Sequence, residues 1–231
     1  MVRLSGLQKV TLLDYPGKIA ATVFTGGCNF RCPYCHNASL VLNTGNTQGI
    51  SEQDFFEFLY KRKGLLDGVC ISGGEPLLQE DIRRFISEIK SLGFLIKLDT
   101  NGSFPSKLKE LIQSGLVDYV AMDIKNSPAG YARTSGTIEN VLPKIMESVA
   151  FLLEGTIKYE FRTTVVKEYH TREDFADIGK WIQGAERYFL QNFVDSGDLI
   201  HPGLQSVDES ELKIFMEIVR KYVPAVQIRT A

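Results

Sequence analysis

The sequence predicts an α/β fold in which parallel strands alternate with helices, arranged as a partial barrel of six βα units. Three observations support this prediction. The 231 residues are 44% hydrophobic and 23% charged, which suits a single domain with a large core. Most of six short runs are too apolar for strands with one face in water, which is typical of buried parallel strands. Stretches with the apolar spacing of a helix lie between these runs.

The predicted strands share this apolar character and lie at residues 19–25, 68–72, 94–98, 117–122, 157–166 and 187–192. A short final strand is expected within 225–229. These elements predict one domain over residues 1–231, with a core at about 10–195 and a C-terminal helix and strand at 208–229. A complete eight-unit barrel typically needs ~250 residues. The length therefore favours a (β/α)6 barrel, with an open doubly wound sheet as the alternative.

The predicted helices have recognisable ends. Ser51 is expected to cap a helix that stops at Gly64. Thr171 and Asp174 resemble a capping box at the start of a later helix. The other amphipathic stretches lie at residues 78–93, 108–115 and 208–223.

Polar residues and glycines lie at the end of each predicted strand, at residues 26–28, 72–76, 99–102, 123–125, 162–164 and 191–192. In parallel α/β folds the carboxyl ends of the strands lie on one face, and ligands bind there. A polar loop or a helix cap explains any one of these motifs, but six in succession favour a shared site at the C-terminal strand ends.

The bulk composition excludes some functions. The formal net charge of −2 gives no sign of a nucleic-acid-binding surface, and no apolar run is long enough to span a membrane. The N-terminus lacks the pattern of a signal peptide. We therefore expect a cytoplasmic protein that binds neither nucleic acid nor a membrane. His170 and His201 are expected on surface loops.

Three cysteines lie close together after the first predicted strand, and they are Cys28, Cys32 and Cys35. Soft thiolates bind iron–sulfur clusters, zinc or copper(I). Three thiolates on a four-iron cluster leave one iron open for a cofactor, whereas zinc with His36 as the fourth ligand is the competing interpretation. Cys70 lies inside an apolar strand and is expected to be a buried core thiol.

Two motifs resemble those of the radical S-adenosylmethionine (SAM) superfamily. They are the CxxxCxxC spacing with Tyr34 before its last cysteine, and the sequence Gly73-Gly74-Glu75-Pro76. The resemblance covers about residues 10–195. Within the superfamily, the chain is similar to glycyl-radical-enzyme activating proteins, and most to the anaerobic ribonucleoside-triphosphate reductase activating proteins. Residues 14–17, 28–37, 99–102 and 122–125 carry this second similarity.

The resemblance implies a TIM-like partial barrel and a radical SAM oxidoreductase. The cofactors it implies are a 4Fe-4S cluster, SAM and a monovalent cation. Reductive cleavage of SAM would give a 5′-deoxyadenosyl radical that takes hydrogen from a glycine of a partner enzyme. The implied partners are a glycyl-radical enzyme of the anaerobic ribonucleotide reductase type and a small electron-donor protein. The alternatives are a radical SAM enzyme acting on a small molecule, such as a deazapurine, and a zinc-binding adaptor without catalysis.

The resemblance also implies roles for individual residues. The catalytic metal ligands would be Cys28, Cys32 and Cys35. The residues expected to bind the cofactor are Tyr34, Gly73, Gly74, Glu75, Asp99, Thr100, Asp123, Lys125, Arg162, Thr163 and Asn192.

Several of these residues have a second interpretation or a more specific role. The cation is expected near Asp99, Thr100 and Asp123. Asp14 is expected near the peptide substrate, with a turn-forming role as the alternative. The alternative for Glu75 is a helix N-terminal carboxylate. Strand register decides whether Arg162 or Thr163 faces the cofactor.

Overall fold

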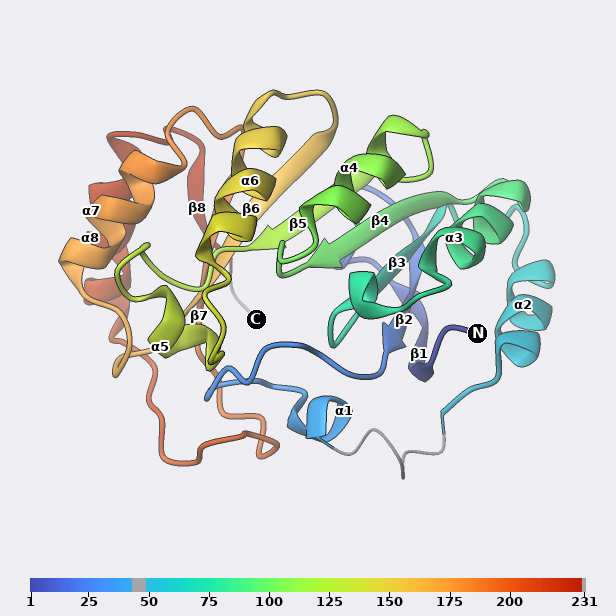
Figure 1. Ribbon diagram of the computed structural model, residues 1–231, viewed down its shortest axis with the longest axis horizontal. Coiled ribbons are helices and arrows are strands. Elements are labelled where there is room, and N and C mark those ends of the chain that lie inside the picture. The colour runs from blue at the N-terminus through green and yellow to red at the C-terminus, as the bar shows by residue number, and fades with distance from the viewer. Residues whose placement is uncertain (43–48, 230–231) are drawn as a thin grey trace. The chain divides into compact units, whose positions relative to one another are not determined.

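The computed structural model describes residues 1–42 and 49–229, which form two compact units (Figure 1). The first unit contains Met1–Asn29, Ser39–Thr100 and Phe104–Val120. The second contains Phe30–Ala38, Asn101–Ser103 and the chain from Ala121 onward. The strands follow sequence order, with β1 to β4 in the first unit, β6 to β8 in the second and β5 divided between them.

The strands are β1 Leu4–Thr11, β2 Ala20–Thr25, β3 Gly68–Gly73, β4 Leu95–Thr100, β5 Tyr119–Asp123, β6 Lys158–Val165, β7 Tyr188–Asn192 and β8 Val226–Arg229. The α-helices are α1 Ala38–Leu42, α2 Glu52–Tyr60, α3 Ile82–Ser91, α4 Pro105–Gln113, α5 Tyr131–Ser135, α6 Leu142–Leu153, α7 Arg172–Trp181 and α8 Glu209–Arg220. One 3₁₀ helix, η1, spans Pro76–Leu78. Among the described residues, no helix is long and apolar enough to cross a membrane.

In the first unit, β1 pairs antiparallel with β2, and β2, β3 and β4 are parallel. Thr22, Cys70 and Lys97 are direct partners across β2, β3 and β4. Phe85 of α3 is fully buried and stacks on Phe55 of α2, with the ring centroids 5.3 Å apart. Burying side chains of this kind contributes about 1.5–3 kcal/mol each. This packing fixes the two helices against each other.

In the second unit, β6, β7 and β8 are parallel neighbours. Helices α7 and α8 pack side by side (Figure 1). Their contact includes Phe175 and Phe215, whose stacked rings have centroids 4.4 Å apart. Thr171 and Asp174 form the capping box that the sequence predicted at the start of α7.

The α/β class and the parallel strands predicted from the sequence are confirmed, and each predicted strand overlaps an observed one. Two long elements were not predicted. β1 was missed because most of its residues are partly or fully exposed, so it has no continuous apolar run. Helix α6 was missed although Pro143 stands in its first turn, a typical start signal. The single-domain organisation stays a prediction.

Candidate functional site

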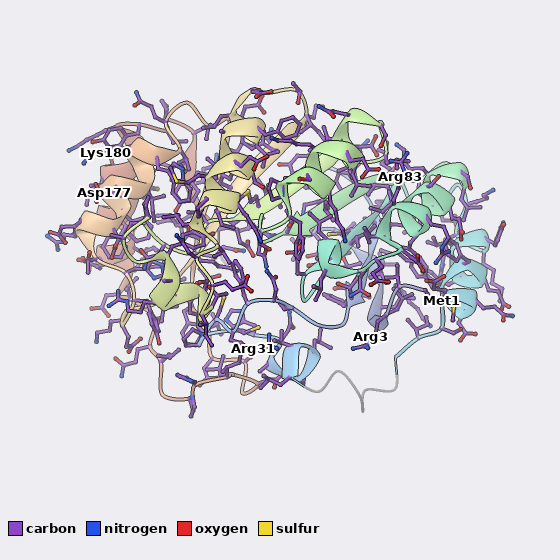
Figure 2. All side chains as sticks on the ribbon, in the orientation of Figure 1. Met1, Arg3, Arg31, Arg83, Asp177 and Lys180 are labelled. Atoms are coloured by element: carbon purple, nitrogen blue, oxygen red, sulfur yellow. The ribbon has the colours of Figure 1, made fainter. Side chains whose placement is uncertain are left out.

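The loop that carries two of the three cysteines lies in the second unit and is held by backbone hydrogen bonds. The Arg31 N–H donates to the Ser135 carbonyl at the end of α5, and the His201 N–H donates to the Pro33 carbonyl, both at 2.9 Å. Figure 2 marks Arg31 on this loop. A Cβ at Gly136 would lie 2.1 Å from the Arg31 carbonyl oxygen, so this contact requires glycine. The course of the cysteine loop is therefore fixed by neighbouring segments.

Cys32 and Cys35 differ in exposure within this loop. Cys32 is 7% exposed, whereas Cys35 is half-buried. Burial raises the pKa of the Cys32 thiol to about 11, although the Lys125 ammonium acts in the opposite direction. The Cys35 N–H donates to the Cys32 carbonyl at 3.0 Å, which closes a tight turn. A thiol in this environment stays protonated unless a metal takes the place of its proton.

Cys28 lies in the first unit, after β2, and is half-buried. Cys32 and Cys35 belong to the second unit. Over residues 1–42 and 49–229, no three His, Cys, Asp or Glu side chains are grouped as a metal site. The joint ligation of a cluster by the three cysteines stays a prediction from their spacing.

Two glycines form the turn that follows β3 in the first unit. Gly73 has a φ of 110°, a conformation that side chains rarely tolerate. A Cβ on Gly74 would lie 1.9 Å from the Gly27 carbonyl oxygen. This approach lets the Gly74 N–H donate to the Thr25 carbonyl, and the Glu75 N–H to the Gly27 carbonyl, both at 2.9 Å. The turn is therefore held tightly against the end of β2.

The Glu75 carboxylate is 0% exposed and binds groups within the first unit. Its Oε1 accepts hydrogen bonds from the Leu77 N–H at 3.0 Å and from the Thr100 hydroxyl at 2.8 Å. Glu75 thus caps the helix η1, which is the structural role that the sequence left open. The bond to Thr100 brings together two of the predicted cofactor-binding residues.

Asp99, in β4, lies among polar side chains of the first unit. Its Oδ1 forms an ion pair with the Lys97 ammonium and lies 3.7 Å from the Cys70 sulfur. The Ser72 hydroxyl donates to Oδ2 at 3.1 Å. Cys70 is fully buried, as predicted, but it contacts this ion pair in addition to the core.

Lys97 was missed from the sequence as a functional residue. It occupies the middle of an apolar run, and lysine is almost never fully buried unless it is paired. That combination was the signal for a buried charge. Its partner, two residues along the same strand, follows from the side-chain alternation of β-structure.

The Asp14 carboxylate reaches β2, where it accepts a hydrogen bond from the Thr22 hydroxyl. The turn after β1 is held by other groups. The Asp14 N–H donates to the Thr11 hydroxyl at 3.2 Å, and the Lys18 N–H donates to the Tyr15 carbonyl at 3.1 Å. The side chain of Asp14 therefore does not close the turn.

Asp123, Lys125 and Arg162 form a group of ion pairs in the second unit. The Arg162 Nε contacts Oδ1 of Asp123 and the Lys125 Nζ contacts Oδ2, each at 3.0 Å. Burial disfavours the charge on Lys125, but the Asp123 carboxylate acting together with Cys32 and Tyr34 outweighs this effect and raises the pKa of Lys125. Two positive groups around one negative group favour a further carboxylate as ligand.

Thr163 lies on the opposite face of β6 from Arg162, because successive side chains of a strand alternate. Its hydroxyl donates to the Ile124 carbonyl at 2.6 Å and also lies 2.6 Å from the Tyr188 hydroxyl. The register thus places Arg162 beside the acidic group and gives Thr163 buried protein partners.

Asn192 and Tyr34 have contrasting environments in the second unit. The Asn192 amide bonds both backbone groups of Val207, at 2.8 Å and 3.2 Å. Tyr34 is buried, its ring lies 6.1 Å from that of Tyr169, and its hydroxyl has no hydrogen-bond partner among the described residues. An unsatisfied buried hydroxyl costs about 1–3 kcal/mol. Tyr34 would therefore gain from a ligand that bonds its hydroxyl.

His170 is 4% exposed, so the prediction that it lies on the surface was wrong. Its Nε2 donates to the Lys125 carbonyl at 3.0 Å, and its Nδ1 accepts from the Val166 N–H at 3.1 Å. These bonds require the neutral ring, and burial lowers the pKa of His170. The misassignment arose because a loop position in the sequence does not reveal tertiary contacts. His170 fixes the backbone that carries Lys125.

Comparisons with known proteins agree with these motifs. The family model described as the radical SAM superfamily matches residues 22–182. A Methanocaldococcus jannaschii protein, provisionally named a glycyl-radical enzyme activating enzyme, is 34% identical over 98% of this chain and 95% of its own length. The pyruvate formate-lyase-activating enzyme of Clostridium pasteurianum is 27% identical over 82% of this chain and 81% of its own length.

A solved structure supports the fold. Streptococcus suis SuiB bound to S-adenosylmethionine matches 89% of this chain with a TM-score of 0.67 and 16% identity. The chain spans about half of that structure's length, 48%, and the likeness concerns the fold alone. The parallel α/β arrangement is thus that of a radical SAM partial barrel, as predicted. The chain is an enzyme that belongs to the radical SAM superfamily, and its relatives over nearly its whole length include glycyl-radical enzyme activating enzymes.

Proposed function

We propose that this protein activates a glycyl-radical enzyme by removing a hydrogen atom from a glycine of that partner. The observation that carries the proposal is 34% identity over 98% of the chain to a protein provisionally named for this activity. The proposed partner is an anaerobic ribonucleoside-triphosphate reductase or a related glycyl-radical enzyme. Its basis is the similarity of residues 14–17, 28–37, 99–102 and 122–125. A small electron-donor protein completes the set of partners.

The family implies a 4Fe-4S cluster and SAM, and the donor groups of this chain fit both. Cys28, Cys32 and Cys35 supply three soft thiolates, one fewer than a closed four-iron site uses. The close approach at Gly74 leaves backbone, without side chains, at the turn after β3. When bound, the reduced cluster supplies one electron that splits SAM into methionine and a 5′-deoxyadenosyl radical.

The remaining residues bind and orient the cofactor in this proposal. The turn of Gly73, Gly74 and Glu75 receives the amino group of SAM. Lys125 and Arg162, which surround Asp123 with positive charge, receive the SAM carboxylate.

The other predicted residues either hold the backbone of the site or contact the nucleoside and the partner's peptide. The unsatisfied hydroxyl of Tyr34 is available to the nucleoside. Thr163 and Asn192 hold the site in place by hydrogen bonds to the backbone carbonyls of Ile124 and Val207. Asp14 lies near the peptide of the partner enzyme that contains the glycine.

The test is anaerobic reconstitution of the cluster, followed by reductant, SAM and purified candidate partners. We expect a brown protein that forms 5′-deoxyadenosine, and a glycyl radical signal in electron paramagnetic resonance when the correct partner is present. Cys28→Ala should lose iron, sulfide and SAM cleavage. Cys70→Ser is the matched control and should retain its iron and sulfide, because Cys70 lies outside the motif.

The possible results separate the alternatives. Formation of 5′-deoxyadenosine without a glycyl radical in any partner would favour an enzyme that acts on a small molecule. A colourless zinc protein would end both proposals. SAM cleavage that persists in Cys28→Ala would show that the three-cysteine assignment is wrong.

A further inference from the structure

Lys97 is a buried cation for which the proposed reaction gives no role. It is 1% exposed, lies in the centre of β4, and its ammonium contacts the Asp99 carboxylate and lies 3.8 Å from the Cys70 sulfur. Moving an ammonium group out of water is costly unless a carboxylate compensates for it. A neutral side chain of similar length, such as Met, would fill the same space without this cost. The charge of Lys97 therefore needs an explanation beyond packing.

The sheet register determines which groups share this face of the first unit. Thr22, Cys70 and Lys97 are direct partners on three adjacent strands, and Asp99 follows on the same face of β4. Asp99 lies near the carboxyl end of β4, where parallel α/β folds bind ligands. Lys97 lies one step deeper along the strand. Its ammonium thus holds the Asp99 carboxylate from the buried side.

The other carboxylate predicted to attract a cation has a comparable environment in the second unit. Lys125 and Arg162 contact the two carboxylate oxygens of Asp123, each at 3.0 Å. Each unit thus neutralises its own carboxylate with basic side chains of its own. A metal cation at either carboxylate would approach an ammonium or a guanidinium group, and like charges at such distances repel.

We propose that Lys97 is a positioning residue whose ammonium is the permanent counter-charge of Asp99, in the place that a monovalent metal cation would otherwise take. That Asp99 binds the cofactor, as the sequence predicts, rests on the proposed function, whereas the coupling between Lys97 and Asp99 does not. Two consequences follow. Removing the ammonium takes the positive charge of Lys97 away from the Asp99 carboxylate, and it opens Asp99 to an external cation.

The coupling is tested by thermal unfolding of the reconstituted protein. Lys97→Met should lower the Tm by roughly 10 °C, because loss of one partner from a buried pair is strongly destabilising. Adding Asp99→Asn in the same chain should restore at least half of that loss, since the side chain that faced the ammonium then carries no charge. Lys97→Arg keeps the charge and should retain more stability than Lys97→Met.

Lys90→Met is the matched control, because it also removes the lysine of a Lys–Asp pair in the first unit. Lys90 contacts both oxygens of Asp118 at 2.9 Å, but it is partly exposed, so we expect a Tm loss of only a few degrees. If Lys97→Met does not fold, Asp99→Asn can be compared directly with the double variant. The proposal requires the double variant to be the more stable of the two.

A second measurement tests whether Lys97 takes the place of a metal cation. The dissociation constant of SAM is measured at constant ionic strength, with either potassium chloride or choline chloride. Wild-type affinity should be the same within about twofold in the two salts. In Lys97→Met, potassium should improve the affinity by roughly tenfold over choline, a difference of about 1.4 kcal/mol. Lys90→Met should behave like the wild type.

Two results would overturn the proposal. One is a wild-type affinity for SAM that rises tenfold in potassium. The other is a loss of stability in Lys97→Met that Asp99→Asn does not relieve, which would mean that Lys97 only fills space. Failure of the wild type to bind SAM would instead refute the proposed function, and the unfolding comparison would still decide the coupling.

Discussion

At the scale of single residues, the face of a strand on which a side chain lies separates ligand binding from structural support. Arg162 and Thr163 are neighbours in β6, and both were predicted to bind the cofactor. The sequence could not choose between them, because choosing requires the strand register. The ion pair between Arg162 and Asp123 and the buried bond between Thr163 and Tyr188 now distinguish the two positions.

We predict opposite effects from changing these neighbours. Arg162→Gln should weaken SAM binding by about 10- to 100-fold, because charge-assisted bonds contribute about 1.5–3 kcal/mol, with little change in the free energy of unfolding. Thr163→Val should lower that free energy by about 1–3 kcal/mol, because the Ile124 carbonyl and the Tyr188 hydroxyl lose a buried partner. Titration calorimetry and urea unfolding measure the two quantities. A larger loss of SAM affinity in Thr163→Val would contradict the assignment.

At the scale of secondary-structure elements, the turn after β3 depends on the absence of a side chain. We predict that Gly74→Ala lowers the free energy of unfolding by more than about 2 kcal/mol and weakens SAM binding, since its Cβ would overlap the Gly27 carbonyl. Gly6→Ala is the matched control. Its Cβ would lie 3.6 Å from the nearest atom of Phe24, so the change should cost less than about 1 kcal/mol. Comparable losses in the two variants would show that close packing of the turn is unimportant.

The C-terminal strand β8 pairs with β7, and its arginine also contacts side chains of β6 and β7. Arg229 forms two bonds to the fully buried Glu160, at 2.8 Å and 3.1 Å, and its guanidinium lies 3.7 Å from the centre of the Phe189 ring. We predict that Arg229→Met costs about 3–5 kcal/mol, because the fully buried Glu160 carboxylate loses both of its bonds to the guanidinium. Adding Glu160→Gln should recover much of this loss in urea unfolding.

An exposed ion pair provides the comparison for Arg229. Arg172 bonds Glu211 in a similar two-point arrangement, at 3.0 Å and 2.8 Å, but on the surface of the second unit. Exposed pairs contribute about 0–1 kcal/mol, so Arg172→Met should have little effect. Equal losses in Arg172→Met and Arg229→Met would mean that the burial of Glu160 does not control the stability of this strand.

At the scale of the whole molecule, the sequence predicted features that depend on local pattern and missed those that depend on distant contacts. The parallel strands, the cap at Ser51 and the capping box at Thr171 follow from periodicity and residue type, and they are confirmed. The contact of Lys97 with Cys70 and the bond of His170 to the Lys125 backbone depend on segments that lie next to these residues only after folding. Neighbouring positions in the sequence gave no direct sign of these two contacts, whereas strand alternation alone places Asp99 on the same face of β4 as Lys97.

Stability as a function of pH combines several of these buried groups. Burial lowers the pKa of His170 from 6.5, which the Asp174 carboxylate opposes and the Arg133 guanidinium reinforces. The unfolded chain therefore binds more protons than the folded chain once the pH falls below about 6.5, and the free energy of unfolding decreases from there toward the folded pKa. Burial also raises the pKa of Tyr131 and Tyr188 from 10.0. The unfolded chain loses those protons first, so stability also decreases as the pH rises above about 10.

We thus predict the greatest stability between about pH 6.5 and 9, because the raised pKa of Cys32 makes the unfolded chain lose that proton first above about pH 9. Urea unfolding across this range and down to about pH 5 measures it. In His170→Gln the free energy of unfolding should decrease less steeply below about pH 6.5, because glutamine replaces the ring and cannot acquire a charge. His201→Gln should leave the profile unchanged, since His201 is exposed. A wild-type stability that is constant from pH 7 to pH 5, or an unchanged slope in His170→Gln, would show that His170 does not control the acid limit. Because His170 donates to the Lys125 carbonyl, SAM affinity should weaken over the same acid range as stability does.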